Sequence, residues 1–83
     1  MKRHDFFETP HDGFLFVELE MGVTYNYYGY QDIYGAVIIE REEVATGKML
    51  YYYTESIDYT TAWTARATTT YTLPAVAFAA LLS

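Results

Sequence analysis

The chain has 83 residues, no cysteine and a formal net charge of −6. A chain of this length buries one small core, so we expect a single domain over residues 1–83. Without thiols it has no disulfide and no thiolate metal site. The surplus of acids argues against a nucleic-acid binder, because Lys and Arg contacts to phosphate supply most of the affinity of such proteins. The charge instead favours a basic protein as partner.

Residues 1–13 predict an irregular leader, because Pro10 and Gly13 interrupt regular structure. The leader lacks the apolar run of a signal peptide. The longest apolar run, residues 75–82, is much shorter than the roughly 20 residues that a membrane span requires. We therefore expect a cytoplasmic protein without a membrane partner.

The leader also contains His4, Asp5, Glu8, His11 and Asp12, whose side chains are ordinary ligands of divalent metals. Their spacing matches no metal-binding motif, and Pro10 interrupts any helix that could bring the two histidines together. We expect a solvated segment here, and we predict no metal site and no cofactor.

Residues 14–28 alternate between two faces, as half-buried strands do. The apolar side chains expected on one face are those of Leu15, Val17, Leu19 and Met21. Gly22 indicates a bulge, and residues 29–35 are expected to form a loop. Residues 36–42 predict the next strand.

Residues 44–49 predict a hairpin turn in which Gly47 adopts a positive φ, and residues 48–59 predict a long strand. The threonine-rich residues 60–73 favour a further strand, with a helical turn over residues 62–67 as the alternative. Pro74 and the alanines after it predict a short C-terminal helix over residues 74–83. The predicted fold is mainly β or α+β, with an antiparallel sheet of four to five strands.

We expect no enzymatic activity. Ser56 and Ser83 are the only serines of a chain without cysteine, and neither lies in a nucleophile motif. The glycines are too scattered to form a phosphate-binding loop.

Two pairs of carboxylates, Glu18 with Glu20 and Glu40 with Glu42, are each two residues apart on an expected strand. Each pair then lies on one side of its strand, and neighbouring strands would combine the four into one patch. Such a patch is either a solvated polar face or a ladder of negative charge that mimics DNA. Like charges across strands cost stability, so a dense patch would indicate function.

Ten tyrosines are the most prominent feature of the composition, and Tyr27–Tyr28 and Tyr51–Tyr53 are consecutive. Successive strand side chains point to opposite faces, so both faces carry phenol rings and a single small core cannot bury them all. Base stacking on these rings would require a cationic groove, whereas tyrosine is enriched at the centres of protein interfaces.

We expect Tyr25 and Tyr27 to share a face with Val23, packed on the core. We expect the remaining tyrosines of this region, around the loop over residues 29–35, to contact a partner. The complete predicted partner-binding set is Tyr28, Tyr30, Asp32, Tyr34, Glu18, Glu20, Glu40, Glu42 and Glu43.

These features predict a small acidic, tyrosine-rich protein–protein interaction module. By analogy of size and charge with phage- and mobile-element-encoded inhibitors of the anti-CRISPR and anti-restriction type, we expect it to block a larger basic, nucleic-acid-handling protein of a bacterial host. The alternative is a structural subunit, in which the tyrosine-rich strands and the apolar C-terminal residues 73–83 pack against copies of the chain or against a neighbour in an assembly. A homodimer is compatible with both hypotheses.

Overall fold

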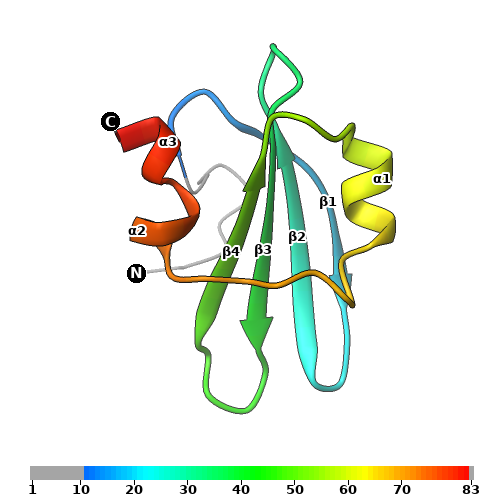
Figure 1. Ribbon diagram of the computed structural model, residues 1–83. Coiled ribbons are helices and arrows are strands. Elements are labelled where there is room, and N and C mark those ends of the chain that lie inside the picture. The colour runs from blue at the N-terminus through cyan, green and yellow to red at the C-terminus, as the bar shows by residue number, and fades with distance from the viewer. Residues whose placement is uncertain (1–10, 83) are drawn as a thin grey trace.

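Four consecutive strands form an antiparallel meander in the order β1-β2-β3-β4 (Figure 1). The structure, a computed structural model, describes residues 11–82. The strands are β1 (Leu15–Met21), β2 (Tyr25–Gln31), β3 (Val37–Glu43) and β4 (Met49–Thr54). The helices are α1 (Tyr59–Thr64), α2 (Pro74–Ala77) and α3 (Ala79–Leu82). The predicted small antiparallel sheet with a short C-terminal helix is confirmed.

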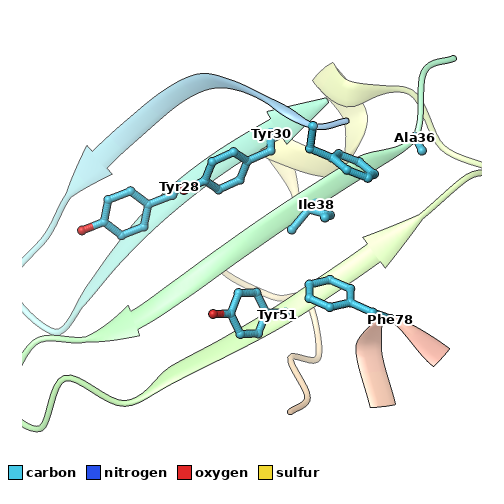
Figure 2. Close-up of a cluster of buried hydrophobic side chains, with 7 residues drawn as sticks. Tyr28, Tyr30, Ala36, Ile38, Tyr51 and Phe78 are labelled. Carbon is cyan, nitrogen blue, oxygen red and sulfur yellow. The ribbon is translucent and has the colours of Figure 1, made fainter. Parts of the chain in front are cut away.

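The sheet lies between two helical layers, and each of its faces has a core of its own (Figure 1). α1 packs against β3 on one face, and α2 packs against β4 on the other. What we call the α1 face buries Tyr27, Val37, Ile39, Ala62 and Tyr71. What we call the α2 face buries Phe14, Tyr28, Tyr30, Ala36, Ile38, Tyr51 and Phe78 (Figure 2). The consecutive tyrosines of β2 and β4 are thus divided between two cores, because neighbouring strand residues point to opposite faces.

The connection between α1 and α2 carries the chain from one side of the sheet to the other (Figure 1). On the way, Thr72 and Tyr51 exchange two backbone hydrogen bonds of 2.8 and 2.9 Å. This bridge gives β4 a neighbour along part of its outer edge. β1 forms the opposite edge of the sheet, and within residues 11–82 it pairs with β2 on one side only.

The side chains of β1 are divided between the two faces differently from the prediction. The pairing of β1 with β2 shifts register between Phe16 and Glu18, so that Val17 forms a bulge. Phe16 and Leu19 consequently both pack on the α2 face, whereas Glu18 lies opposite Gly29 on the α1 face. A single inserted residue reverses the alternation on which the prediction depended.

β2 extends further than predicted. Gly29 is paired on both sides within the strand, so the loop predicted over residues 29–35 is wrong, and the turn occupies residues 32–36. Val23 is also misplaced by the prediction, since its side chain is 94% exposed rather than packed with Tyr25 and Tyr27. The rings of Tyr25 and Tyr27 do share the α1 face, with centroids 6.2 Å apart.

The strand predicted over residues 60–73 is wrong, because this segment begins with α1 and only Thr72 forms a bridge to the sheet. Asp58 caps α1 by accepting hydrogen bonds from the backbone N–H and the hydroxyl of Thr61, at 3.4 and 2.6 Å. A carboxylate at this position satisfies backbone donors that have no partner in the first helical turn. β4 ends at Thr54, so the strand predicted to continue to residue 59 is shorter than expected, and α1 follows the cap at Asp58.

The predicted C-terminal helix is present as α2 and α3, and it begins at Pro74, which fits the first helical turn. Of the predicted leader, residues 11–13 are described, and they form a turn in which the Phe14 N–H donates to the His11 carbonyl at 3.3 Å. His4, Asp5 and Glu8 lie outside the described residues. Within residues 11–82, none of the helices is long and apolar enough to cross a membrane.

Candidate functional site

A pocket opens at the end of the sheet where the turn over residues 32–36 joins β2 to β3. Asp32 fixes this turn, because its Oδ1 accepts hydrogen bonds from the backbone N–H groups of Tyr34 and Ala36, at 2.9 and 2.8 Å. Gly35 allows the reversal, since its φ of 91° is one that residues with a side chain rarely adopt. The turn therefore holds the Asp32 carboxylate and the Tyr34 ring at the rim of the sheet.

The other wall of the pocket comes from residues just before and after the end of β4. The hydroxyl of Tyr53 donates a hydrogen bond to Glu55, and Leu81 of α3 adds an apolar side chain. The pocket has a volume of about 340 Å³. Its described lining consists of Asp32, Tyr34, Ala36, Tyr53, Glu55 and Leu81. We call it the acidic pocket.

The charged side chains in the described lining of the acidic pocket, those of Asp32 and Glu55, are both acidic. The pKa of the Tyr53 phenol is raised to about 12, mainly by burial. Glu55 adds to the shift through its hydrogen bond and its charge, and Asp32 adds to it through its charge. Both carboxylates thus act on one phenol and disfavour its anion. Lys, Arg and His are absent from the described lining, so no described base neutralises this charge.

This arrangement fits a cationic side chain. Two carboxylates from different loops supply acceptors for an ammonium or guanidinium group. Leu81 and the Tyr34 ring, which is 88% exposed, can pack against the aliphatic part of Lys or Arg. The pocket is charged and partly sheltered from water. Sheltered ion pairs contribute more to the free energy of binding than exposed ones do.

Of the predicted partner-binding residues, the structure brings Asp32 and Tyr34 together in the acidic pocket. The prediction that Tyr28 and Tyr30 lie on the surface is wrong, because each is 4% exposed (Figure 2). Their rings pack in the core of the α2 face, against Ile38 and its neighbours. The second core, which the prediction did not include, is the physical reason.

Glu40 and Glu42 are also inside the α2 face rather than on an open surface. Glu40 is 1% exposed, and its Oε1 accepts a hydrogen bond from the Tyr30 hydroxyl at 3.2 Å. Glu42 is half-buried and accepts from the hydroxyl of Tyr28 at 2.8 Å and from Asn26 Nδ2 at 3.1 Å. Phenols of β2 thus solvate carboxylates of β3.

The single patch of four carboxylates, which we considered either as a solvated face or as a ladder that mimics DNA, does not form. Glu18 and Glu20 lie on the α1 face, where Glu18 accepts from the Tyr59 hydroxyl at 3.1 Å and Glu20 pairs with Arg66 at 2.9 Å. β2 lies between β1 and β3, and the bulge at Val17 places the two pairs on opposite faces. Glu43 lies at the far end of β3, where the Thr46 hydroxyl donates to it at 2.7 Å.

Glu55, Tyr53 and Leu81 were missed by sequence reasoning. Their convergence depends on the return of the chain to β4 through α2 and α3, which no local pattern indicates. The available signal was the Asp32-x-x-Gly35 spacing of a tight turn, which identifies one wall of the pocket but not the other.

Within residues 11–82, no three His, Asp or Glu side chains are placed to hold a metal ion together. No protein-family model, curated protein sequence or solved structure matches this chain.

Proposed function

We propose that the protein is a small protein-binding module whose acidic pocket receives a Lys or Arg side chain from a basic partner. The observation that carries the proposal is the pairing of Asp32 and Glu55 in one pocket without a described base. Tyr34 and Ile33, which are 88% and 79% exposed, extend the contact surface along the rim of the turn. Exposed aromatic side chains beside a charged pocket are typical of interface centres.

A nucleic-acid-handling protein is the partner class that we propose, because such proteins present clusters of Lys and Arg on their binding surfaces. The module would act as an inhibitor of the mobile-element type by occupying one of those basic side chains. This mode of binding needs a pocket and an exposed rim, and it does not require a ladder of charge that imitates DNA.

The pocket can be tested with the blocked amino acids N-acetyl-lysine amide and N-acetyl-arginine amide as probes. We expect saturable chemical-shift changes, by nuclear magnetic resonance, at residues 32–36 and 53–55. Asp32→Asn retains the acceptor that fixes the turn and removes the charge, and Glu55→Gln removes the second charge. We expect each variant to weaken binding by roughly fivefold, the effect of one partly sheltered ion pair.

Glu20→Gln is the matched control, because it also removes one negative charge, but on the α1 face, where the Glu20 carboxylate already forms an ion pair with Arg66. Shifts that spread over the whole acidic surface, or an equal loss in the Glu20 variant, would show that the pocket is not a specific site. A basic partner isolated with the wild-type protein should be lost in the Asp32→Asn, Glu55→Gln double variant and kept in the control.

A second candidate, the structural subunit, is favoured by the apolar side chains along β1. Leu15 and Met21 of this edge strand are 65% and 67% exposed, and Val23 in the turn after it is 94% exposed. Exposed strand edges pair readily with other chains. Sedimentation velocity over a wide concentration range tests this candidate. We expect Met21→Lys to abolish any concentration-dependent association, and a wild-type monomer at every concentration would contradict self-assembly.

A further inference from the structure

Two arginines of the α1 face differ in what their guanidinium groups contact. Arg66 stacks over the Trp63 ring, 4.6 Å from its centroid. Its Nε donates to Glu20 at 2.9 Å, and its Nη1 donates to the Trp63 carbonyl at 2.7 Å. Two nitrogens of the Arg66 guanidinium therefore donate to acceptors within the protein.

The guanidinium group of Arg41 lies against two aromatic rings. Its guanidinium carbon lies 4.4 Å from the centroid of the Tyr25 ring and 4.8 Å from that of Tyr71. No hydrogen bond or ion pair joins the guanidinium to another residue in the described part of the chain. Two tyrosines thus fix the orientation of the planar Arg41 guanidinium group. Residues 11–82 supply no hydrogen-bond acceptor for its N–H donors.

Arg41 also lines a second pocket, which has a volume of about 170 Å³. It lies beside the turn over residues 44–48, which joins β3 to β4. This turn and the turn over residues 32–36, which lines the acidic pocket, are at opposite ends of the sheet (Figure 1). The described lining consists of Tyr25, Arg41, Glu43, Lys48 and Leu50. We call it the Arg41 pocket.

The turn brings Lys48 to the Arg41 pocket. The Glu43 N–H donates to the Lys48 carbonyl at 2.9 Å, and the Gly47 N–H donates to the Glu43 carbonyl at 2.7 Å. Gly47 has a φ of 75°, which closes the turn and returns the chain beside β3. As a result, two of the three Lys and Arg residues within residues 11–82 line one small pocket of an acidic protein.

We propose that the Arg41 pocket binds a phosphate group. Arg41 and Lys48 outweigh the single carboxylate of Glu43, which leaves a formal charge of +1 to attract an anion. The fork of a guanidinium group matches two oxygens of a phosphate, and a dianion gains more from the two cations than a carboxylate does. Glu43 already accepts a hydrogen bond from the Thr46 hydroxyl at 2.7 Å, so its carboxylate has another partner in the turn.

Titration with inorganic phosphate at constant ionic strength, balanced with chloride, tests the site by nuclear magnetic resonance. We expect a saturable shift of the Arg41 Nε–Hε signal and of the Lys48 amide, with a dissociation constant on the order of millimolar. Acetate is the second probe, and we expect it to bind about tenfold more weakly. Equal affinity for acetate would overturn the assignment to phosphate.

Four variants distinguish a specific phosphate site from general attraction of phosphate to cationic side chains. Arg41→Lys keeps the charge and loses the fork, and we expect about tenfold weaker binding. Lys48→Gln, at an exposed side chain that does not support the fold, should weaken binding about fivefold. Glu43→Gln should strengthen it about fivefold, because it removes the one negative charge of the pocket. Arg66→Lys is the matched control and should change nothing.

Shifts that follow total ionic strength rather than phosphate would overturn the proposal. So would unchanged affinity in both the Lys48 and the Glu43 variant, or an equal loss in the Arg66 control. Because Lys48 and Glu43 lie outside the core, these outcomes are decisive even if the Arg41 variant does not fold.

Discussion

Gly29 lies in the middle of β2, at the point where the Tyr59 ring of α1 meets the sheet. A Cβ atom at this position would lie 2.1 Å from the Tyr59 hydroxyl oxygen, which is far inside contact distance. The same hydroxyl donates to Glu18, and the Tyr59 ring stacks on Trp63 with an interplanar angle of 13°. The missing side chain therefore allows α1 to approach the α1 face, a close approach that glycine permits in a strand.

We predict that Gly29→Ala destabilises the protein by about 1–3 kcal/mol, the usual cost of forcing an extra carbon into a packed site. The ring of Tyr59 must move, which breaks its hydrogen bond to Glu18 and its stacking on Trp63. Urea denaturation followed by circular dichroism measures the change in the free energy of unfolding.

The control for this prediction is the same substitution in a Tyr59→Ala background. Without the ring, alanine should be neutral or stabilising, because it loses less backbone freedom on folding than glycine does. A penalty for Gly29→Ala that is equal in both backgrounds would mean that contact with Tyr59 is not its cause.

At the scale of elements, β3 and the turn that follows it were predictable from the sequence, whereas the turn before it was predicted to begin three residues too early, at residue 29 instead of 32. Residues 36–42 form a run of apolar and charged side chains between two turns that contain glycine, and the structure has β3 at Val37–Glu43. Both Gly35 and Gly47 adopt positive φ values, as the turns require. Local chemistry decided β3 and the turn over residues 44–48, so local patterns were sufficient to find these two elements.

α1 and the bulge of β1 were not predictable in the same way. Residues 59–64 contain three threonines and two aromatic residues, which all favour strands. The helix forms because Asp58 caps it and because Ala62 packs on the core of the α1 face. That packing is a tertiary contact, and tertiary contacts override weak propensities. The bulge at Val17 likewise depends on the pairing with β2 rather than on the sequence of β1 alone.

The candidate site was predictable in part for the same reason. Asp32 and Tyr34 belong to a turn that the sequence indicates, whereas Glu55 and Leu81 join them only through the folding of β4 and α3. Tyr28 and Tyr30 were placed on the surface because one core was assumed. The structure has a helical layer on each face, and so it buries phenols on both.

At the scale of the whole molecule, this two-sided burial determines how the protein responds to alkali. Burial is the main cause of the raised pKa values of Tyr28, Tyr53, Tyr59 and Tyr71, which belong to both faces of the sheet. Carboxylates add to the effect in three cases, Glu42 at Tyr28, Glu55 at Tyr53 and Glu18 at Tyr59. The fold therefore depends on phenols that remain protonated.

We predict that the protein unfolds cooperatively in alkali, at a pH above the ordinary phenol pKa of about 10. The pKa of each of these four phenols is higher in the folded than in the unfolded chain, and that of Tyr53 is about 12. Their contribution to stability is accordingly complete below about pH 10 and is lost as the pH rises through the folded values.

Tyrosinate absorbance and circular dichroism, recorded together, measure tyrosine ionisation and unfolding. We expect a late phase of tyrosine ionisation that coincides with loss of the native spectrum, and one fewer phenol in that phase for Tyr53→Phe. In concentrated guanidinium chloride all ten tyrosines should titrate together near pH 10. Ionisation of every phenol near that pH with an intact native spectrum would contradict the prediction.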